Sequence, residues 1–95
     1  MEIESVRHKA LRLYLETGKP KGLDAQVAGR IRNMVAFIVS AHDVDELRIP
    51  PNFGFHALTG DRSGSYAMTV TRNWRMTFGL SSDGAITDLD LEDYH

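Results

Sequence analysis

The feature that most constrains this chain is a change in hydrophobic period near Asn52. Before it, apolar residues recur every three or four positions, which is the spacing of an amphipathic helix. After it, apolar and polar residues alternate, which is the spacing of a strand with one buried face. A chain with helices first and strands afterwards predicts an α+β protein in which the helices cover one face of a sheet.

Two helices are predicted in the first 40 residues. The first spans residues 7–16, because Gly18 suits the position after a helix C-terminus and Pro20 prevents the helix from resuming. The second follows its N-cap, Asp24, and runs to about residue 40. Their apolar stripes are Ala10, Leu11, Tyr14 and Leu15 in the first, and Val27, Ile31, Met34, Val35 and Ile38 in the second. Residues 2–5 alternate weakly and predict a short edge strand.

Four strands are predicted in the second half of the chain, over residues 53–60, 65–71, 74–80 and 85–92. Short turns separate them, so consecutive strands are expected to pair antiparallel as a meander. In the third strand Trp74, Met76 and Phe78 share one face, with Trp74 expected to anchor the core. Arg75 and Thr77 share the other face, which is expected to be wetted. The two helices are the only elements available to cover the apolar face.

Composition narrows the classes of function. The 95 residues suit one domain, 1–95, and the lack of cysteine excludes disulfides, a thiolate nucleophile and Cys-ligated metal sites. The start of the chain shows no stretch with the apolar length of a signal peptide or membrane span, so we expect a cytoplasmic protein without a membrane partner. The net charge of −2 argues against a free-standing nucleic-acid binder. That total hides a gradient, because residues 1–32 carry seven basic and four acidic side chains, whereas residues 33–95 carry four and nine.

Histidine, arginine and tyrosine residues are the candidates for chemistry. Cleavage of RNA by a neighbouring 2′-hydroxyl needs a proton acceptor, a proton donor and a cation for the charge that develops on phosphorus. Histidine suits both proton transfers, arginine suits the phosphate, and an aromatic ring stacks on an unpaired base. No metal-ligand cluster or nucleotide-binding glycine loop is present, and His8 and His42 are expected on the surface. The remaining parts are His56, His95, Arg62, Arg72, Arg75, Tyr66 and Tyr94.

Three strings carry a resemblance to a known family: FHALTGDRSGSYAMTV, RNWRMTFGL and the terminal LEDYH. They resemble the HigB-type toxins of the RelE/ParE superfamily, whose usual pattern is H-P-L-K-G-D-R, then N-W-R-I-T-F, then E-D-Y-H. The opening SVRHKALRLYLETGKPKG is also similar to the start of those toxins, so the resemblance covers nearly the whole chain. It implies an α+β fold with two N-terminal helices packed on a curved antiparallel sheet of four to five strands.

The resemblance also implies a function and partners. HigB-type toxins of type II toxin–antitoxin systems are ribosome-dependent endoribonucleases that cut messenger RNA in the decoding site and so inhibit translation. A helix-turn-helix antitoxin of the HigA type neutralises them. The expected partners are therefore this antitoxin, the ribosome and messenger RNA, with operator DNA contacted only through the antitoxin. We expect neither a metal nor another cofactor.

Carried over by position, the resemblance implies site residues. The implied catalytic cluster consists of His56, Asp93, Tyr94 and His95. The resemblance supports Arg62, Arg72 and Arg75 as RNA contacts and leaves open which of them holds the scissile phosphate. Thr59 stands where the family usually has lysine, so either another cation such as Arg62 replaces that lysine or the chain is a weak nuclease.

Two other functions fit the same pattern. A ParE-like toxin would inhibit DNA gyrase by binding it, without nuclease chemistry, and one superfamily fold supports both outcomes. The ending Glu92-Asp93-Tyr94-His95 favours the nuclease, because a pure binder does not require that histidine. A degenerate toxin that acts as an antitoxin-binding module is the third reading, and Thr59 is its main support.

Overall fold

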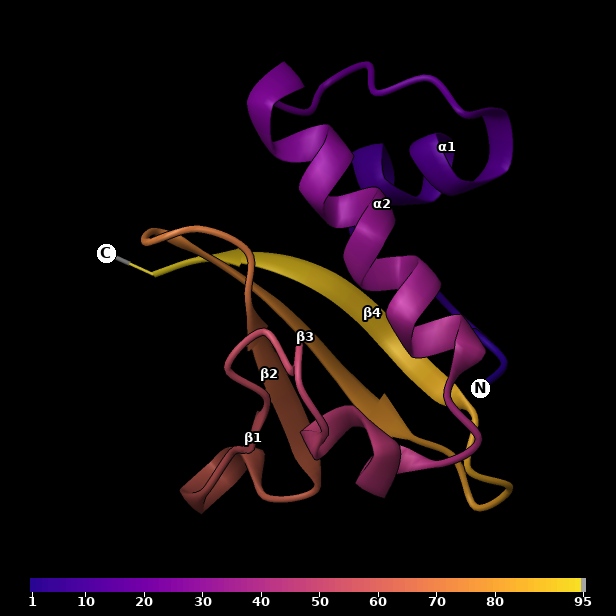
Figure 1. The fold of residues 1–95 in the computed structure, drawn as a ribbon, viewed down its shortest axis with the longest axis vertical. Helices are drawn as coiled ribbons and strands as arrows, with labels where there is room; N and C mark the ends of the chain where they lie inside the picture. The colour runs from indigo at the N-terminus through magenta and orange to yellow at the C-terminus, as the bar shows by residue number, and fades with distance from the viewer. Residues whose placement is uncertain (95) are drawn as a thin grey trace.

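The computed structural model describes residues 1–94 and shows two helices on one side of a four-stranded antiparallel sheet (Figure 1). This arrangement confirms the predicted fold class. Helix α1 spans Lys9–Thr17 and α2 spans Ala25–Ser40, and two short 3₁₀ helices follow, η1 over Val44–Arg48 and η2 over Gly60–Arg62. Within residues 1–94, no helix has the length and apolar character needed to cross a membrane.

The ends of both helices follow the predicted signals closely. His8 caps α1, since its Nδ1 atom accepts the Leu11 amide at 3.2 Å, and α1 therefore begins at Lys9, two residues later than predicted. Gly18 ends α1 with a φ of 75°, which glycine adopts without steric cost, and donates its N–H to the Tyr14 carbonyl at 2.8 Å. Asp24 caps α2 by accepting the Gln26 amide at 2.8 Å.

The strands form the predicted meander in the order β1-β2-β3-β4. Strand β1 is His56–Ala57, β2 is Ser65–Thr69, β3 is Trp74–Leu80 and β4 is Ile86–Asp93. The prediction of a strand over 53–60 was too long, because Phe53 and Gly54 turn the chain with positive φ values of 50° and 69° before β1 begins. The predicted N-terminal edge strand is reduced to two isolated parallel bridges with β4, Ile3 to Ile86 and Val6 to Leu89.

One apolar cluster lies between the helices and the sheet. Met68, Met76 and Leu91 share one row across β2, β3 and β4, and their side chains belong to the core together with those of α2. Phe78 is 2% exposed and packs against Phe55 and Tyr66, with ring centroids 6.4 Å and 5.8 Å away. We call this side of the sheet the core face.

Two predictions about β3 were wrong. Trp74 is 37% exposed rather than a core anchor, because it lies at the start of β3, where an apolar hollow of about 90 Å³ separates it from α2. Thr77 was expected on a wetted face but is only 2% exposed. Its hydroxyl donates to the Glu92 carboxylate at 2.5 Å, so a polar contact covers it.

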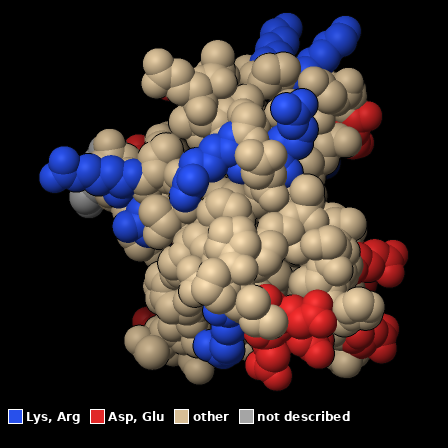
Figure 2. All heavy atoms as spheres, in the orientation of Figure 1, with Lys and Arg blue, Asp and Glu red and all other residues tan. Residues whose placement is uncertain are grey.

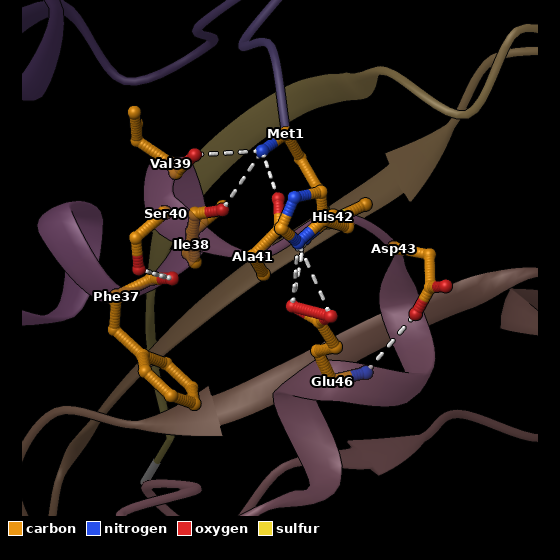
Figure 3. A network of polar contacts seen from close by, with 9 residues as sticks. All are labelled: Met1, Phe37, Ile38, Val39, Ser40, Ala41, His42, Asp43 and Glu46. Atoms are coloured by element: carbon orange, nitrogen blue, oxygen red, sulfur yellow. Dashed lines mark hydrogen bonds and ion pairs between the residues drawn. The ribbon is translucent and has the colours of Figure 1, made fainter.

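Polar contacts at several places along helix α2 attach it to the rest of the protein. Arg30 Nε donates to the Val70 carbonyl at 2.5 Å, and its guanidinium lies 5.2 Å from the Phe53 ring centroid. At the other end, the Met1 nitrogen donates to the carbonyls of Ile38, Val39 and Ala41 (Figure 3). The last carbonyls of a helix lack intrahelical partners and carry partial negative charge, so a donor there is favourable.

We expect Phe78→Ala to lower the free energy of unfolding by about 3–5 kcal/mol, the usual range for truncating a buried aromatic. Trp74→Ala is the matched control, because it removes a larger but 37% exposed side chain from the same strand. Trp74→Ala is expected to lower the free energy of unfolding by about half as much as Phe78→Ala, or less. Urea unfolding followed by circular dichroism measures both values. A loss for Trp74→Ala equal to that for Phe78→Ala would contradict this packing.

Candidate active site on the outer face of the sheet

The side of the sheet opposite the core face carries four of the eight predicted site residues, His56, Arg62, Arg75 and Tyr94. Strand alternation and register place His56, Ala67, Thr77 and Asp90 in one row across the four strands. The next row contains Thr69, Arg75 and Glu92. We call this side the outer face. It brings polar side chains from both edge strands and from the central strand β3 onto one surface.

His56 is exposed at the β1 edge of the outer face. Its Nδ1 atom lies 2.9 Å from the Gly54 carbonyl. Because a carbonyl oxygen only accepts, Nδ1 must carry the proton of that hydrogen bond, and Nε2 of the neutral ring is then left as the acceptor. This tautomer suits a group that takes a proton from a hydroxyl.

Arg75 and Tyr94 form a pair at the β4 edge. Arg75 Nη1 donates to the backbone carbonyls of Thr71, Arg72 and Trp74 at 2.8, 3.2 and 3.3 Å. The guanidinium carbon lies 5.1 Å from the centroid of the Tyr94 ring. Among residues 1–94, no carboxylate forms an ion pair with this guanidinium, so its positive charge is not offset there and can attract an anion. The Tyr94 amide, which donates to the Asn73 carbonyl at 2.6 Å, ties the end of β4 to the same turn.

Arg62 reaches across the outer face from η2 to β4. Its two Nη atoms donate to the Glu92 carboxylate at 2.8 and 2.6 Å, and the Thr77 hydroxyl donates to the same carboxylate at 2.5 Å. The hydrogen bonds from Arg62, followed by the one from Thr77, hold the pKa of Glu92 below its ordinary value despite partial burial. The same pairing raises the pKa of Arg62. Unlike Arg75, Arg62 therefore has its charge largely neutralised.

The other predicted site residues lie elsewhere. Tyr66 is on the core face, with its ring stacked between Phe55 at 5.4 Å and Phe78 at 5.8 Å, so the structure does not bring it to the outer face. Asp93 pairs with Trp74 and is exposed, and alternation places it on the core-face side at the end of β4. Arg72 is exposed in the turn between β2 and β3. The predicted role of His95 lies outside the described residues.

The sequence interpretation did not predict that Glu92 and Thr77 take part in the polar contacts of the outer face. The alternation of β4 does place Glu92 on the same face as Asp90, so its side was readable from the sequence. Its partner was not, because Arg62 is 30 residues away along the chain. Among residues 1–94, no group of three or more His, Cys, Asp or Glu side chains is arranged to hold a metal ion.

The charge gradient along the sequence corresponds to separate basic and acidic regions on the surface. On the side shown in Figure 2, Lys and Arg side chains gather over the helices and near the C-terminal end of the sheet. Asp and Glu side chains gather where η1 and the β3–β4 turn lie. An overall charge of −2 therefore coexists with a positive region near the C-terminal end of the sheet.

Two solved structures share the fold of this chain. The crystal structure of YafQ from E. coli strain BL21(DE3) aligns with a TM-score of 0.58 at 13% identity, over 94% of this chain and 91% of YafQ. The YoeB/ParE toxin from Agrobacterium tumefaciens aligns with a TM-score of 0.52 at 16% identity, over 100% of this chain and 99% of that toxin. At such low identity these similarities establish the shared fold.

Sequence comparison is more specific. A protein from Proteus vulgaris named Endoribonuclease HigB is 39% identical over 93 residues, which is 98% of this chain and 99% of that relative. The family model described as "RelE-like toxin of type II toxin-antitoxin system HigB" matches residues 4–95. Because both matches span almost the entire chain and agree with the fold, this chain belongs to the HigB-like family of RelE-like toxins from type II toxin–antitoxin systems.

Proposed function

We propose that this toxin is a ribosome-dependent endoribonuclease that cleaves messenger RNA in the decoding site and thereby stops translation. The observation that carries the proposal is the Arg75–Tyr94 pair, which presents an aromatic ring and a cation with no ion-pair partner among residues 1–94 on the same sheet face as His56. An RNA substrate requires both groups, one for phosphate and one for a base. The 39% identical relative, named as an endoribonuclease, supports the same activity.

The proposed chemistry uses the 2′-hydroxyl of the RNA as the nucleophile and needs no metal. One histidine, His56 or His95, accepts the 2′-hydroxyl proton, and the other protonates the 5′-oxygen that leaves. Arg75 stabilises the charge that develops on phosphorus. Tyr94 stacks on a base, and Asp93 orients a histidine or tunes its charge. In this scheme Arg75 supplies the cation that binds the phosphate. This chain has Thr59 at the sequence position where the family usually has a lysine.

The negative net charge of the chain supports the proposed dependence on the ribosome. Non-specific affinity for free RNA grows with the number of cations that displace counterions from phosphates. This chain has a net charge of −2, and Glu92 neutralises Arg62, so few cations are available for naked RNA. A ribosome that presents the message in a fixed position compensates for that weak affinity. The proposed location is the cytoplasm, where translating ribosomes are found.

As a type II toxin, the chain has an antitoxin as its partner. We propose that this antitoxin is a helix-turn-helix protein of the HigA type, and that the toxin contacts operator DNA only through it. The positive side of the surface, next to α1 and α2, is available to an acidic segment of such a partner.

We expect His95→Ala and His56→Ala each to abolish growth arrest on expression, since losing a general acid or base slows such reactions by about 100- to 10,000-fold. The control is His42→Ala, because His42 lies between α2 and η1 with an 88% exposed side chain that pairs with Glu46 (Figure 3) and belongs to neither row of the outer face. Colony counts after induction, with circular dichroism of each purified variant, provide the measurement. Full toxicity of either folded catalytic variant would contradict the assignment.

We expect Arg75→Lys to reduce cleavage of ribosome-bound message by about 100-fold, the effect of removing one donor from a charge-stabilising site. Lysine has a single point charge and cannot reproduce both the carbonyl contacts and the flat contact with Tyr94. Arg72→Lys is the matched variant, since Arg72 is three residues away and exposed in the turn. Single-turnover cleavage rates compare the two, and equal losses would mean that Arg75 has no special role at the phosphate.

Primer-extension mapping of cellular messages after induction tests the function as a whole. The proposal expects cuts within translated codons that disappear when initiation is blocked. In vitro, purified toxin should cut naked RNA little at physiological salt and cut programmed ribosomes efficiently. DNA double-strand breaks without such cuts would instead establish gyrase inhibition, and neither effect would leave a toxin that only binds its antitoxin.

A further inference from the structure

We propose that Glu92 is a positioning residue that holds the segment from His56 to Arg62 against the sheet by gripping Arg62. This inference rests on the proposed function, because it concerns how His56 is kept in place for RNA cleavage. Glu92 itself touches neither the phosphate nor the base in this scheme. We call the contact of Arg62 and Thr77 with Glu92 the clamp.

The segment that carries His56 is weakly attached by its own backbone. Strand β1 pairs with β2 through two residue pairs only, His56 with Ala67 and Ala57 with Tyr66. One further amide, Leu58 N–H, donates to the Ser65 carbonyl at 2.9 Å. Short edge strands with so few ladder bonds open readily. Before β1 the segment is fixed by the Thr69 amide, which donates to the Phe53 carbonyl at 2.7 Å, and by the buried Phe55 ring. After Leu58 no backbone hydrogen bond to the sheet is seen among residues 1–94 until Ser65, so a side-chain contact there adds to what holds His56 in place.

The loop after β1 has few backbone contacts with the sheet. Gly60, at the start of η2, and Gly64, just before β2, have φ values of 64° and 96°, which glycine adopts without strain. The 3₁₀ turn between them has long backbone hydrogen bonds, 3.3 Å from the Arg62 amide to the Thr59 carbonyl and 3.1 Å from the Ser63 amide to the Gly60 carbonyl. The Arg62 side chain is the strongest polar attachment of this loop to the rest of the sheet.

The other side of the clamp is rigid. Glu92 belongs to β4, which pairs with β3 along almost its full length, and Thr77 lies in the middle of β3 with 2% exposure. Thr77 is in the same row across the sheet as His56, with Ala67 between them. The clamp therefore anchors the segment from His56 to Arg62 to the central strand at the level of His56. The lowered pKa of Glu92 keeps its carboxylate ionised at neutral pH, as a bidentate pair requires.

The residues of the clamp line a hollow on the outer face, and a second ion pair lines the same hollow. This pair, Arg7 with Asp88 at 3.5 Å, provides a matched control. Asp88 is on β4 like Glu92, but Arg7 precedes α1 and has no connection with the segment after β1. Asp88→Asn removes the same charge from the same strand, and asparagine tolerates the φ of 51° at that position.

Hydrogen exchange of the folded toxin measures the clamp without any substrate. We expect Glu92→Gln to speed exchange of the Leu58 amide by about five- to tenfold, the effect of losing a charged hydrogen bond, with the β3 and β4 amides unchanged. Asp88→Asn should leave Leu58 unchanged. The double variant Arg62→Glu with Glu92→Arg should restore slow exchange, since it re-forms the pair with reversed charges. Unchanged Leu58 exchange in Glu92→Gln would overturn the clamp.

Kinetics on programmed ribosomes then test the effect on His56. We expect Glu92→Gln to lower kcat by about ten- to a hundredfold with KM unchanged, because small displacements of a catalytic group have effects of that size. Unchanged kcat, or a change confined to KM, would overturn the positioning role. Wild-type toxin that failed to cleave would refute the proposed function instead, while the exchange measurement would still decide whether the clamp exists.

Discussion

The alternation of β3 is the constraint on which the rest of this structure depends. Because neighbouring side chains of a strand point to opposite sides, seven residues must serve two different surfaces at once. Met76 and Phe78 enter the apolar cluster under α2, while Arg75 and Thr77 face the polar outer surface. A register shift of one residue would exchange these sets, placing an arginine in the core and exposing an aromatic ring. The core and the candidate site are therefore specified by the same strand pairing.

The two arginines of the outer face differ in the charge of their hydrogen-bond partners. Arg62 is paired with the Glu92 carboxylate, whereas the Arg75 Nη1 donor binds backbone carbonyls, which carry no formal charge. A phosphate approaching this face would meet a nearly neutral contact at one arginine and a cation at the other. In the proposed function, this difference separates the role of Arg62 in holding the protein together from the role of Arg75 in binding RNA. A chain of net charge −2 can still present a cation at one place.

Much of the fold was predictable from local signals, and the two errors about β3 share one cause. The caps Gly18 and Asp24 and the four-strand meander were confirmed, because each depends on residues close together in the chain. Trp74 and Thr77 were assigned to the wrong environments, since their burial depends on what lies across from them. The exposure of Trp74 reflects the hollow beside α2, and the burial of Thr77 reflects the polar cover formed by Arg62 and Glu92.

The amino-acid sequence specified the order of helices and strands, the side of the sheet to which each β3 residue points and, through its motifs, the toxin family. The tertiary structure alone decided which polar groups meet. It placed Tyr66 in an aromatic stack of the core, joined Arg62 to Glu92 and set Arg75 against Tyr94. The physical reason is range: helix caps and strand periods arise within a few residues, whereas a charge finds its partner only after distant segments have packed together.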